Sequence, residues 1–253
     1  MNVCSPRKLL AVAVLCSACL PDDEAPVSVR NEQAATPGPD ALNSAADAGS
    51  ENDPGPLTRE DGLSFFVTSR THPTGNLGGL AGADATCTEL ATAVGAGDHV
   101  WKAYLSSSGE NARDRIGAGP WFNARSIQVA ATVAALHALQ GDAELFIDER
   151  GVKIDGQWNS VTPNQHDILT GSAADGTLAP PDTMGRSANC EDWTSNGTDA
   201  FAQVGHSDGM GPMMAQDPVF YTSWNSSHAN QDCSNTAPRG GAGRFYCFAS
   251  GRK

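Results

Sequence analysis

The sequence is poor in aromatic and basic residues and lacks an apolar run long enough to cross a membrane as a helix. Its aromatic residues (eight Phe, five Trp and three Tyr) all lie at or beyond Phe65, so a hydrophobic core is confined to the last three quarters of the 253-residue chain. Lys and Arg total 16 against 29 Asp and Glu, a formal charge of −13. Such a surface repels phosphate backbones, so we expect no nucleic-acid partner, although solubility alone also explains the acidity.

Motifs for metal ions and for calcium-dependent sugar binding are also missing. No Glu-Pro-Asn, Gln-Pro-Asp or Trp-Asn-Asp triplet marks a lectin-type calcium site. The histidines show no H-E-x-x-H or H-x-H spacing, and loop histidines are usually solvated: His72, His99, His137, His166, His206 and His228. We therefore expect no metal and no cofactor.

Residues 1–18 are typical of an export signal. A positive pair, Arg7 and Lys8, precedes the apolar run Leu9–Leu15, and small residues follow before Cys19. This arrangement resembles a lipobox, in which the cysteine receives a diacylglyceryl group after cleavage, although a cysteine stands where leucine is usual.

The number of cysteines separates lipidation from ordinary secretion. Of seven cysteines, Cys4 and Cys16 leave with the signal and four belong to the globular region. Ordinary cleavage after Ala18 would leave Cys19 as an odd thiol in an oxidising compartment, which is disfavoured. We therefore expect Cys19 to be a lipid anchor, the only membrane contact, and the protein to be held in a bacterial cell envelope at the outer membrane. The alternative is a secreted protein.

Residues 19–58 are expected to form a disordered acidic tether. From Leu20 to Thr58 there are six prolines, eight acids and a single base, Arg30, and no aromatic residue. Such a stretch cannot bury enough apolar area to offset its ordering entropy. A flexible coil of this length spans on the order of 35 Å, which suits a spacer.

The globular region, 59–253, opens with a predicted strand and a predicted helix. Leu63–Ser69 is short, apolar and β-branched, as in a strand. The helix is expected to open at Gly82 and stop at Gly95, with Asp84 in its first turn or at its N-cap. Spacing at i, i+3, i+4 and i+7 predicts its buried face: Cys87, Leu90, Ala91 and Val94.

Further along the chain, regular structure becomes sparse. Val100–Ser106 alternates like a strand, Ile127–Leu139 has mostly helical spacing, and a hairpin is predicted around Asp148–Gly151. Beyond Asn159 the residues are mainly Gly, Asn, Ser, Asp and Pro, and three stretches resemble strands: Ala200–Val204, Val219–Ser223 and Arg244–Ala249. The predicted fold class is α+β, one domain with long irregular loops.

Loops of this length need fastening, and four cysteines remain to supply it. Cys87, Cys190, Cys233 and Cys247 allow three pairings. The nested pairing, Cys87–Cys247 with Cys190–Cys233, would clamp the predicted helix to the last strand and separately close the loop region. In the chain-entropy model these bridges would contribute roughly 5 and 4 kcal/mol. Because Cys190 and Cys233 lie in Asn- and Ser-rich segments, their bridge is expected to be peripheral.

An ordered set of short motifs resembles the endostatin domain of collagens XV and XVIII and the bacterial endostatin-like surface lipoproteins first described in leptospires. No single motif is diagnostic, but their order is the family's order from Leu63 to the C-terminus. The matching pieces are Gly75-Asn-Leu-Gly-Gly, Gly82-Ala-Asp, Cys87, Ala93-Val-Gly, Lys102-Ala-Tyr-Leu-Ser-Ser, Gly171-Ser172, Cys190-Glu191 with Trp193-Thr194, Cys233 and Cys247.

The resemblance implies a C-type-lectin-like fold, paired first and last strands, the nested disulfides and a binding role, since bacterial members are adhesins for host matrix and complement proteins. Two departures limit what carries over. The zinc ligands of endostatin lie at its N-terminus and on its first strand, where this chain has Phe65. Its heparin surface is rich in arginine, whereas residues 60–253 hold 12 bases and 21 acids. Neither zinc nor heparin binding is expected.

One stretch, Gly205-His-Ser-Asp-Gly209, matches the nucleophile-elbow pattern G-x-S-x-G, which would make Ser207 the nucleophile of an esterase. That elbow needs a helix directly after the serine, and Gly209, Gly211 and Pro212 disfavour one. Only 44 residues follow Gly209, too few for the rest of a hydrolase sheet. We expect no enzymatic activity.

Binding surfaces favour aromatic anchors beside adaptable polar residues. Trp121, Trp224, Met210 and Met213 lie in loop-like segments and are the predicted ligand contacts. Trp193 follows the family motif and is predicted to pack in the core.

The leading hypothesis is a surface-tethered lipoprotein whose domain binds an extracellular protein or polysaccharide, as an adhesin does, without catalysis. One alternative is a structural envelope lipoprotein with no specific ligand. The other is a serine esterase that uses Ser207.

Overall fold

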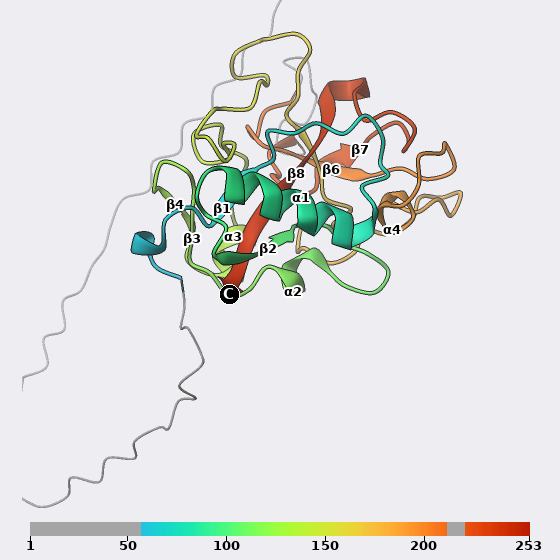
Figure 1. Ribbon diagram of the computed structural model, residues 1–253. Coiled ribbons are helices and arrows are strands. Elements are labelled where there is room, and N and C mark those ends of the chain that lie inside the picture. The colour runs from blue at the N-terminus through green and yellow to red at the C-terminus, as the bar shows by residue number, and fades with distance from the viewer. Residues whose placement is uncertain (1–56, 212–220) are drawn as a thin grey trace, which may run out of the picture. The chain divides into compact units, whose positions relative to one another are not determined.

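The C-terminal strand β8 (Gly241–Arg252) organises the sheet of the computed structural model, which describes residues 57–211 and 221–253 (Figure 1). It pairs antiparallel with β1 (Phe65–Val67) and with β2 (His99–Ala103). The pairing of the first and last strands, which the family resemblance implies, is therefore present.

On the side of β8 opposite β1, the sheet continues with three short strands. β5 (Asp167–Leu169) runs parallel to β8, and β6 (Gln203–His206) pairs antiparallel with β5. β7 (His228–Ala229) lies at the edge, antiparallel to β6. Their registers place Asp167 opposite His206, and Val204 opposite His228. Polar residues of three strands thus meet at one place.

Alternation along β8 divides the interior into two cores, because successive side chains of a strand point to opposite faces. Phe245, Cys247 and Ala249 pack in one cluster with the buried side of the long helix. Tyr246 and Phe248 point the other way, into an aromatic cluster. This second cluster also contains Phe65, Tyr104, Trp121, Phe146 and Trp224.

The long helix α1 (Gly79–Ala93) crosses in front of β8 in Figure 1 and covers the first core. Its buried residues include Cys87, Leu90 and Ala91, as the spacing predicts. Val94 is the exception, because it caps the helix C-terminus and is 40% exposed. Gly95 follows with φ of 86°, a left-handed conformation that glycine adopts freely and that ends the helix where expected.

Asp84 does not cap α1, contrary to the prediction. The helix begins five residues earlier, at Gly79, so Asp84 lies in its second turn. Its carboxylate accepts a hydrogen bond from the backbone N–H of Ala103 (2.9 Å) and contacts Lys102 Nζ (2.9 Å) and Arg115 Nη2 (3.0 Å). The residue joins α1 to β2 rather than stabilising the start of the helix.

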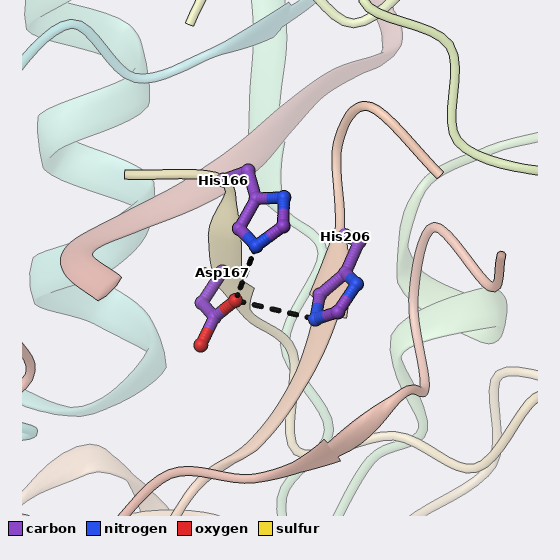
Figure 2. A group of neighbouring side chains, drawn as sticks. All are labelled: His166, Asp167 and His206. Atoms are coloured by element: carbon purple, nitrogen blue, oxygen red, sulfur yellow. Dashed lines mark ion pairs between the residues drawn. The ribbon is translucent and has the colours of Figure 1, made fainter. Parts of the chain in front are cut away.

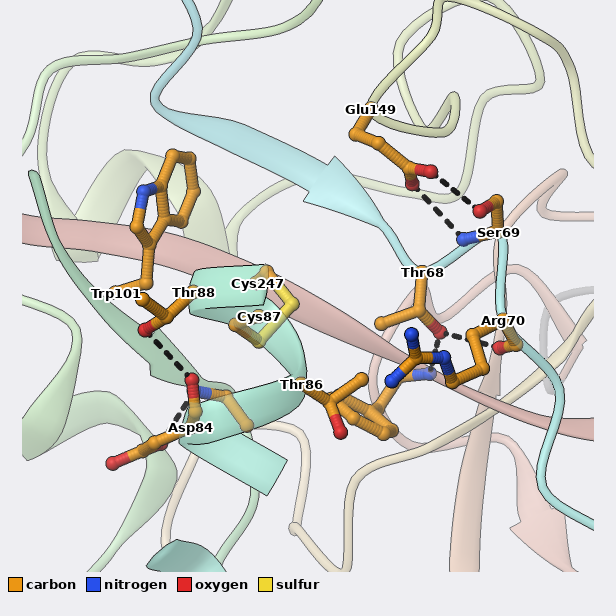
Figure 3. Close-up of a disulfide and its surroundings, with 12 residues drawn as sticks. Thr68, Ser69, Arg70, Asp84, Thr86, Cys87, Thr88, Trp101, Glu149 and Cys247 are labelled. Carbon is orange, nitrogen blue, oxygen red and sulfur yellow. Dashed lines mark hydrogen bonds between the residues drawn. A yellow bond between two sulfur atoms is a disulfide. The ribbon is translucent and has the colours of Figure 1, made fainter. Parts of the chain in front are cut away.

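The nested disulfide pattern is confirmed. Cys87 on α1 and Cys247 on β8 are joined, with their Cα atoms 5.6 Å apart (Figure 3). Cys190 and Cys233 form the second bridge. The first bridge therefore links the helix to the central strand, and the second closes the loop-rich half of the domain.

The second bridge is not peripheral, which corrects the prediction. Both Cys190 and Cys233 are fully buried in the first core. Gly75 packs directly on the bridge: a Cβ at this position would lie 2.2 Å from Cys190 Sγ, and its N–H donates to the carbonyl of Cys233 (2.8 Å). The prediction failed because the neighbouring residues in the sequence are polar while the cysteine side chains themselves point into the core.

The predicted helix Ile127–Leu139 is wrong in its first half. Gln128–Ala130 forms strand β4, which pairs with β3 (Trp121–Phe122). Only Val133–His137 is helical (α3), and the Thr132 hydroxyl caps it by accepting the N–H of Ala135 (3.1 Å). Val129 has a β-branched side chain that suits a strand, and Thr132 marks the later start of the helix.

Of the remaining secondary-structure predictions, some agree with the structure and others do not. The turn at Asp148–Gly151 is present, with a bridge between Ile147 and Lys153. Arg244–Ala249 lies within β8, whereas the strand expected at Ala200–Val204 begins only at Gln203. The short elements that complete the described chain are η1 (Arg59–Asp61), α2 (Ala112–Arg115), α4 (Cys190–Trp193) and η3 (Pro238–Gly240). Among the described residues, no helix is long and apolar enough to span a bilayer.

Several predictions fall outside the described residues. These are the signal 1–18, the anchor Cys19, most of the tether 19–58, Met213 and the beginning of the strand at Val219–Ser223. The end of the predicted tether belongs to the domain, because Leu57 is 5% exposed and packs in the first core.

Candidate functional site

Two predicted ligand contacts, Trp121 and Trp224, lie in the core and not at the surface. The indole N–H of Trp121 donates to the carbonyl of Ala249 (3.1 Å), and that of Trp224 donates to Leu136 (3.0 Å). Burying the large apolar area of an indole is favourable even among polar sequence neighbours, provided that its N–H has a hydrogen-bond partner. Met210 is 43% exposed and remains accessible.

Trp193 is buried, as predicted, and it ends an unusual turn. All four residues of α4, Cys190–Trp193, have positive φ, between 50° and 65°. None of them is glycine, so α4 is one turn of left-handed helix. This conformation costs roughly 1–2 kcal/mol per residue, which means that the surrounding structure must hold it.

Side-chain contacts hold this turn in place. The indole N–H of Trp193 donates to the carbonyl of Ser106 (2.9 Å). The Asp192 carboxylate accepts the backbone N–H of Ser108 (2.7 Å) and an amide N–H of Asn189 (2.8 Å). Burial acts to raise the pKa of Asp192, but its hydrogen bonds with Ser108 and Asn189 outweigh burial and hold the pKa below its usual value. Asp192 therefore stays ionised.

A concave surface of about 350 Å³ lies beside the left-handed turn. Its lining includes the apolar residues Leu178, Ala179 and Pro181. The acidic residues Glu191 and Asp192 line it as well. We call this surface the α4 pocket. Its volume is at the lower end of the range for ligand sites, and its acidic residues disfavour anionic ligands.

Ser207 does not stand on a nucleophile elbow. It follows β6, but the described residues after it, Asp208–Gly211, are not helical. Ser207 is 1% exposed, and its N–H donates to the carbonyl of His166 (3.0 Å). In the described part of the chain, no histidine hydrogen-bonds to its hydroxyl. The described residues therefore place no histidine as a base on the Ser207 hydroxyl.

A second polar site lies where β5, β6 and β7 meet, and we call it the histidine cluster: His166, Asp167, His206 and His228. Asp167 and His206 are cross-strand partners, so their side chains share one face of the sheet. Figure 2 shows the rings of His166 and His206 directed at the Asp167 carboxylate. His166, Asp167 and His206 are at most 3% exposed, although we expect solvated histidines from the sequence. That expectation is wrong.

Three ring nitrogens converge on Asp167. Nε2 of His166 and Nε2 of His206 lie 3.2 Å and 3.3 Å from Oδ1, and Nε2 of His228 lies 3.5 Å from Oδ2. Nε2 of His206 is also 2.9 Å from Nε2 of His228. Imidazole and carboxylate are donors for divalent transition metals, and the donor atoms of His166, Asp167 and His206 are close enough together to hold an ion, with His228 adjacent.

Outer contacts orient two of these rings. Nδ1 of His166 contacts Asp208 Oδ1 (2.7 Å), and Nδ1 of His228 contacts the carbonyl of Ala229 (3.0 Å). Burial acts to raise the pKa of Asp208, but the hydrogen bond and charge of His166 outweigh it, so the pKa is lowered. Burial lowers the pKa of His228, which favours the neutral ring.

Sequence reasoning missed the histidine cluster because its members are far apart along the chain. Only the pair His166-Asp167 is local, and its spacing matches no metal motif. The other two positions depend on the registers of β6 and β7. The α4 pocket was also missed, because no glycine marks the positive φ of Cys190–Trp193.

No protein-family model and no curated protein matches this chain.

Proposed function

We propose that this chain is an exported, lipid-anchored binding protein of a bacterial cell envelope. Its domain has a C-type-lectin-like fold of the endostatin type, binds an extracellular protein or polysaccharide, and catalyses no reaction. The pairing of β1 with β8, the two nested disulfides and the order of the family motifs support the fold. The segment before Cys19 supports export and anchoring.

The left-handed turn beside the α4 pocket carries the binding proposal. Strained backbone persists only where the surrounding structure over-determines it, and such strain concentrates at ligand sites. Here a disulfide, a buried indole and the Asp192 hydrogen bonds hold four strained residues at the rim of a concave surface. Glu191 lines this surface with a second carboxylate. A hydroxyl-rich or cationic ligand group suits it, and a phosphate or sulfate does not.

The test uses an array of purified extracellular matrix proteins and neutral, basic and sulfated polysaccharides. Wild-type protein should bind at least one neutral or basic member. Glu191→Lys should weaken that binding at least tenfold, because it reverses the charge in the pocket. Glu60→Lys makes the same charge change at an exposed position on η1 and should leave affinity unchanged.

Two results would contradict the proposal. Binding to no member of the array would favour the structural envelope alternative. An equal loss of affinity in Glu191→Lys and Glu60→Lys would mean that the overall charge of the protein, and not the pocket, determines binding. Labelling of Ser207 by a fluorophosphonate, lost in Ser207→Ala, would contradict the absence of catalysis and favour the esterase alternative.

A further inference from the structure

The Asp167 carboxylate is in an environment that the described residues do not satisfy. It is 1% exposed, and neither oxygen has a hydrogen-bond partner among the described residues. Buried polar atoms are almost always hydrogen-bonded, and a buried charge is paired or bound to a metal. An unsatisfied buried carboxylate therefore calls for a specific partner.

The approach of two imidazole rings to one oxygen of this carboxylate sharpens the requirement. Nε2 of His166 and Nε2 of His206 lie 3.2 Å and 3.3 Å from Asp167 Oδ1, yet neither forms a hydrogen bond with it. A cation held between these three atoms would satisfy all of them.

The donor atoms of His166, Asp167 and His206 are close enough together for one ion, since all lie within 4.8 Å of one another. Zinc binds imidazole nitrogen and carboxylate oxygen at about 2.0–2.2 Å, which puts neighbouring ligands of a tetrahedron about 3.3–3.6 Å apart. The contacts of Asp167 Oδ1 with Nε2 of His166 and of His206 measure 3.2 and 3.3 Å. His228 lies next to this group, with its Nε2 3.5 Å from Asp167 Oδ2 and 2.9 Å from Nε2 of His206.

The outer contacts are those of metal-binding histidines. Such residues place the nitrogen that does not bind the metal against a carboxylate or a backbone carbonyl. Nδ1 of His166 meets Asp208, and Nδ1 of His228 meets the carbonyl of Ala229. Nε2 of His166 then faces Asp167 Oδ1, and Nε2 of His228 faces Asp167 Oδ2. Close by, Gly240 has φ of 110°, and a Cβ there would lie 3.3 Å from Asp167 Oδ1, so a larger residue would crowd the site.

We propose that His166, Asp167 and His206 bind one zinc ion through two Nε2 atoms and the Asp167 carboxylate, and that Nε2 of the adjacent His228 is the fourth ligand. Four protein ligands make a closed site, which is the structural type of zinc centre. The ion joins β5, β6 and the edge strand β7. It lies on other strands than the zinc site of endostatin, and it does not depend on the binding role of the α4 pocket.

The experiment uses the full chain with both disulfides formed, purified without a polyhistidine tag. After removal of metal with a chelator, zinc should bind with a stoichiometry of one, and cobalt should give the strong visible absorption of tetrahedral coordination. Zinc should raise the melting temperature, and a chelator should reverse the shift. Less than half an equivalent of zinc, or a weak octahedral cobalt spectrum, would overturn the proposal.

Variants assign the ligands. His228→Ala changes the most accessible member, whose side chain is 19% exposed, and should weaken zinc binding at least tenfold while the protein still folds. His72→Ala is the matched control: it removes another partly buried histidine, whose ring packs on Phe245, and should keep wild-type affinity. Equal affinity of His228→Ala and wild type would remove His228 from the site and overturn the four-ligand proposal. If His228→Ala does not fold, Asp167→Asn in the cobalt spectrum replaces it.

Discussion

Arg115 is a buried cation whose charge is balanced mainly by one residue. Its side chain is 3% exposed, and Nη2 lies 3.0 Å from Asp84 Oδ2. Nη1 donates to the carbonyl of Ala103 (2.8 Å), and Nε reaches the half-exposed Glu110 (3.2 Å). Removing one partner of a buried ion pair leaves an uncompensated charge, which costs more than the pair itself contributes.

Asp84→Asn should therefore destabilise the domain by about 3 kcal/mol. The asparagine keeps the shape of the side chain but loses the charge that faces Arg115 and Lys102. Denaturant unfolding with both disulfides intact measures the change. The control is Asp114→Asn, at an exposed carboxylate that should cost less than about 0.5 kcal/mol. Similar values for both variants would show that Asp84 contributes no more than a surface charge.

A single histidine should make stability depend on pH. Burial lowers the pKa of His137, and the charge of Arg113 adds to this effect, while the carbonyl of Val133 and the carboxylate of Asp175 act against it. The ring also contacts the Tyr104 hydroxyl at 2.7 Å. Because the unfolded pKa is about 6.5 and the folded pKa is lower, protons bind the unfolded state more tightly. The contribution of His137 to the free energy of unfolding is complete above about pH 6.5, and it is lost as the pH falls through the pKa of the folded state.

His137→Gln should reduce the fall in unfolding free energy between about pH 7 and pH 5. Glutamine can still hydrogen-bond to Tyr104, but it does not titrate. The measurement is a series of denaturant curves in the presence of a chelator, so that metal binding plays no part. The fall is reduced and not abolished, because His72 has a pKa lowered by burial as well. Parallel curves for wild type and variant would contradict the assignment.

At the scale of elements, the loop-rich half depends on the contact between Gly75 and the Cys190–Cys233 bridge. A Cβ at Gly75 would lie 2.2 Å from Cys190 Sγ and 3.0 Å from Cys233 Cβ. Neither sulfur can move far, because both cysteines are fully buried. The segment that leads into α1 and the segment that carries α4 thus share one close contact.

Gly75→Ala should cost about 2–3 kcal/mol through overpacking, and it should speed reduction of the Cys190–Cys233 bridge relative to Cys87–Cys247. Thermal unfolding and the rate of thiol labelling under mild reductant measure the two effects. Gly109→Ala is the control, because its nearest neighbouring atom would be 4.0 Å away. A stable alanine variant with an unchanged rate of disulfide reduction would mean that the backbone shifts to accept the methyl group without strain.

The whole molecule shows which features the sequence could predict. Arg244–Ala249 and Cys87 are recognisable because apolar alternation and helical spacing are local properties. The histidine cluster is not, because two of its members meet Asp167 only through strand registers that distant parts of the chain determine. Trp121 shows a different error. Its polar sequence neighbours suggest a surface position, but its ring packs on Phe248 in the core.

The proposed lipid anchor also concerns the whole molecule, since it would decide where the protein is held. Cys19→Ala should abolish incorporation of labelled acyl chains and release the protein from membranes, because a single small side chain cannot replace the lipid. Detergent-phase partitioning measures the release. Ala18→Ser, with the cysteine retained, is the matched control and should stay in the detergent phase. Unchanged partitioning of Cys19→Ala would contradict lipidation and favour ordinary secretion.

The position of β8 determines how this domain folds. The strand pairs with β1 and β2, which come far earlier in the sequence, and Cys247 on β8 is bonded to Cys87, 160 residues away. The sheet therefore has no centre until these distant segments meet. Because closing such large loops is slow, we expect the native state to form in one late step dominated by long-range contacts.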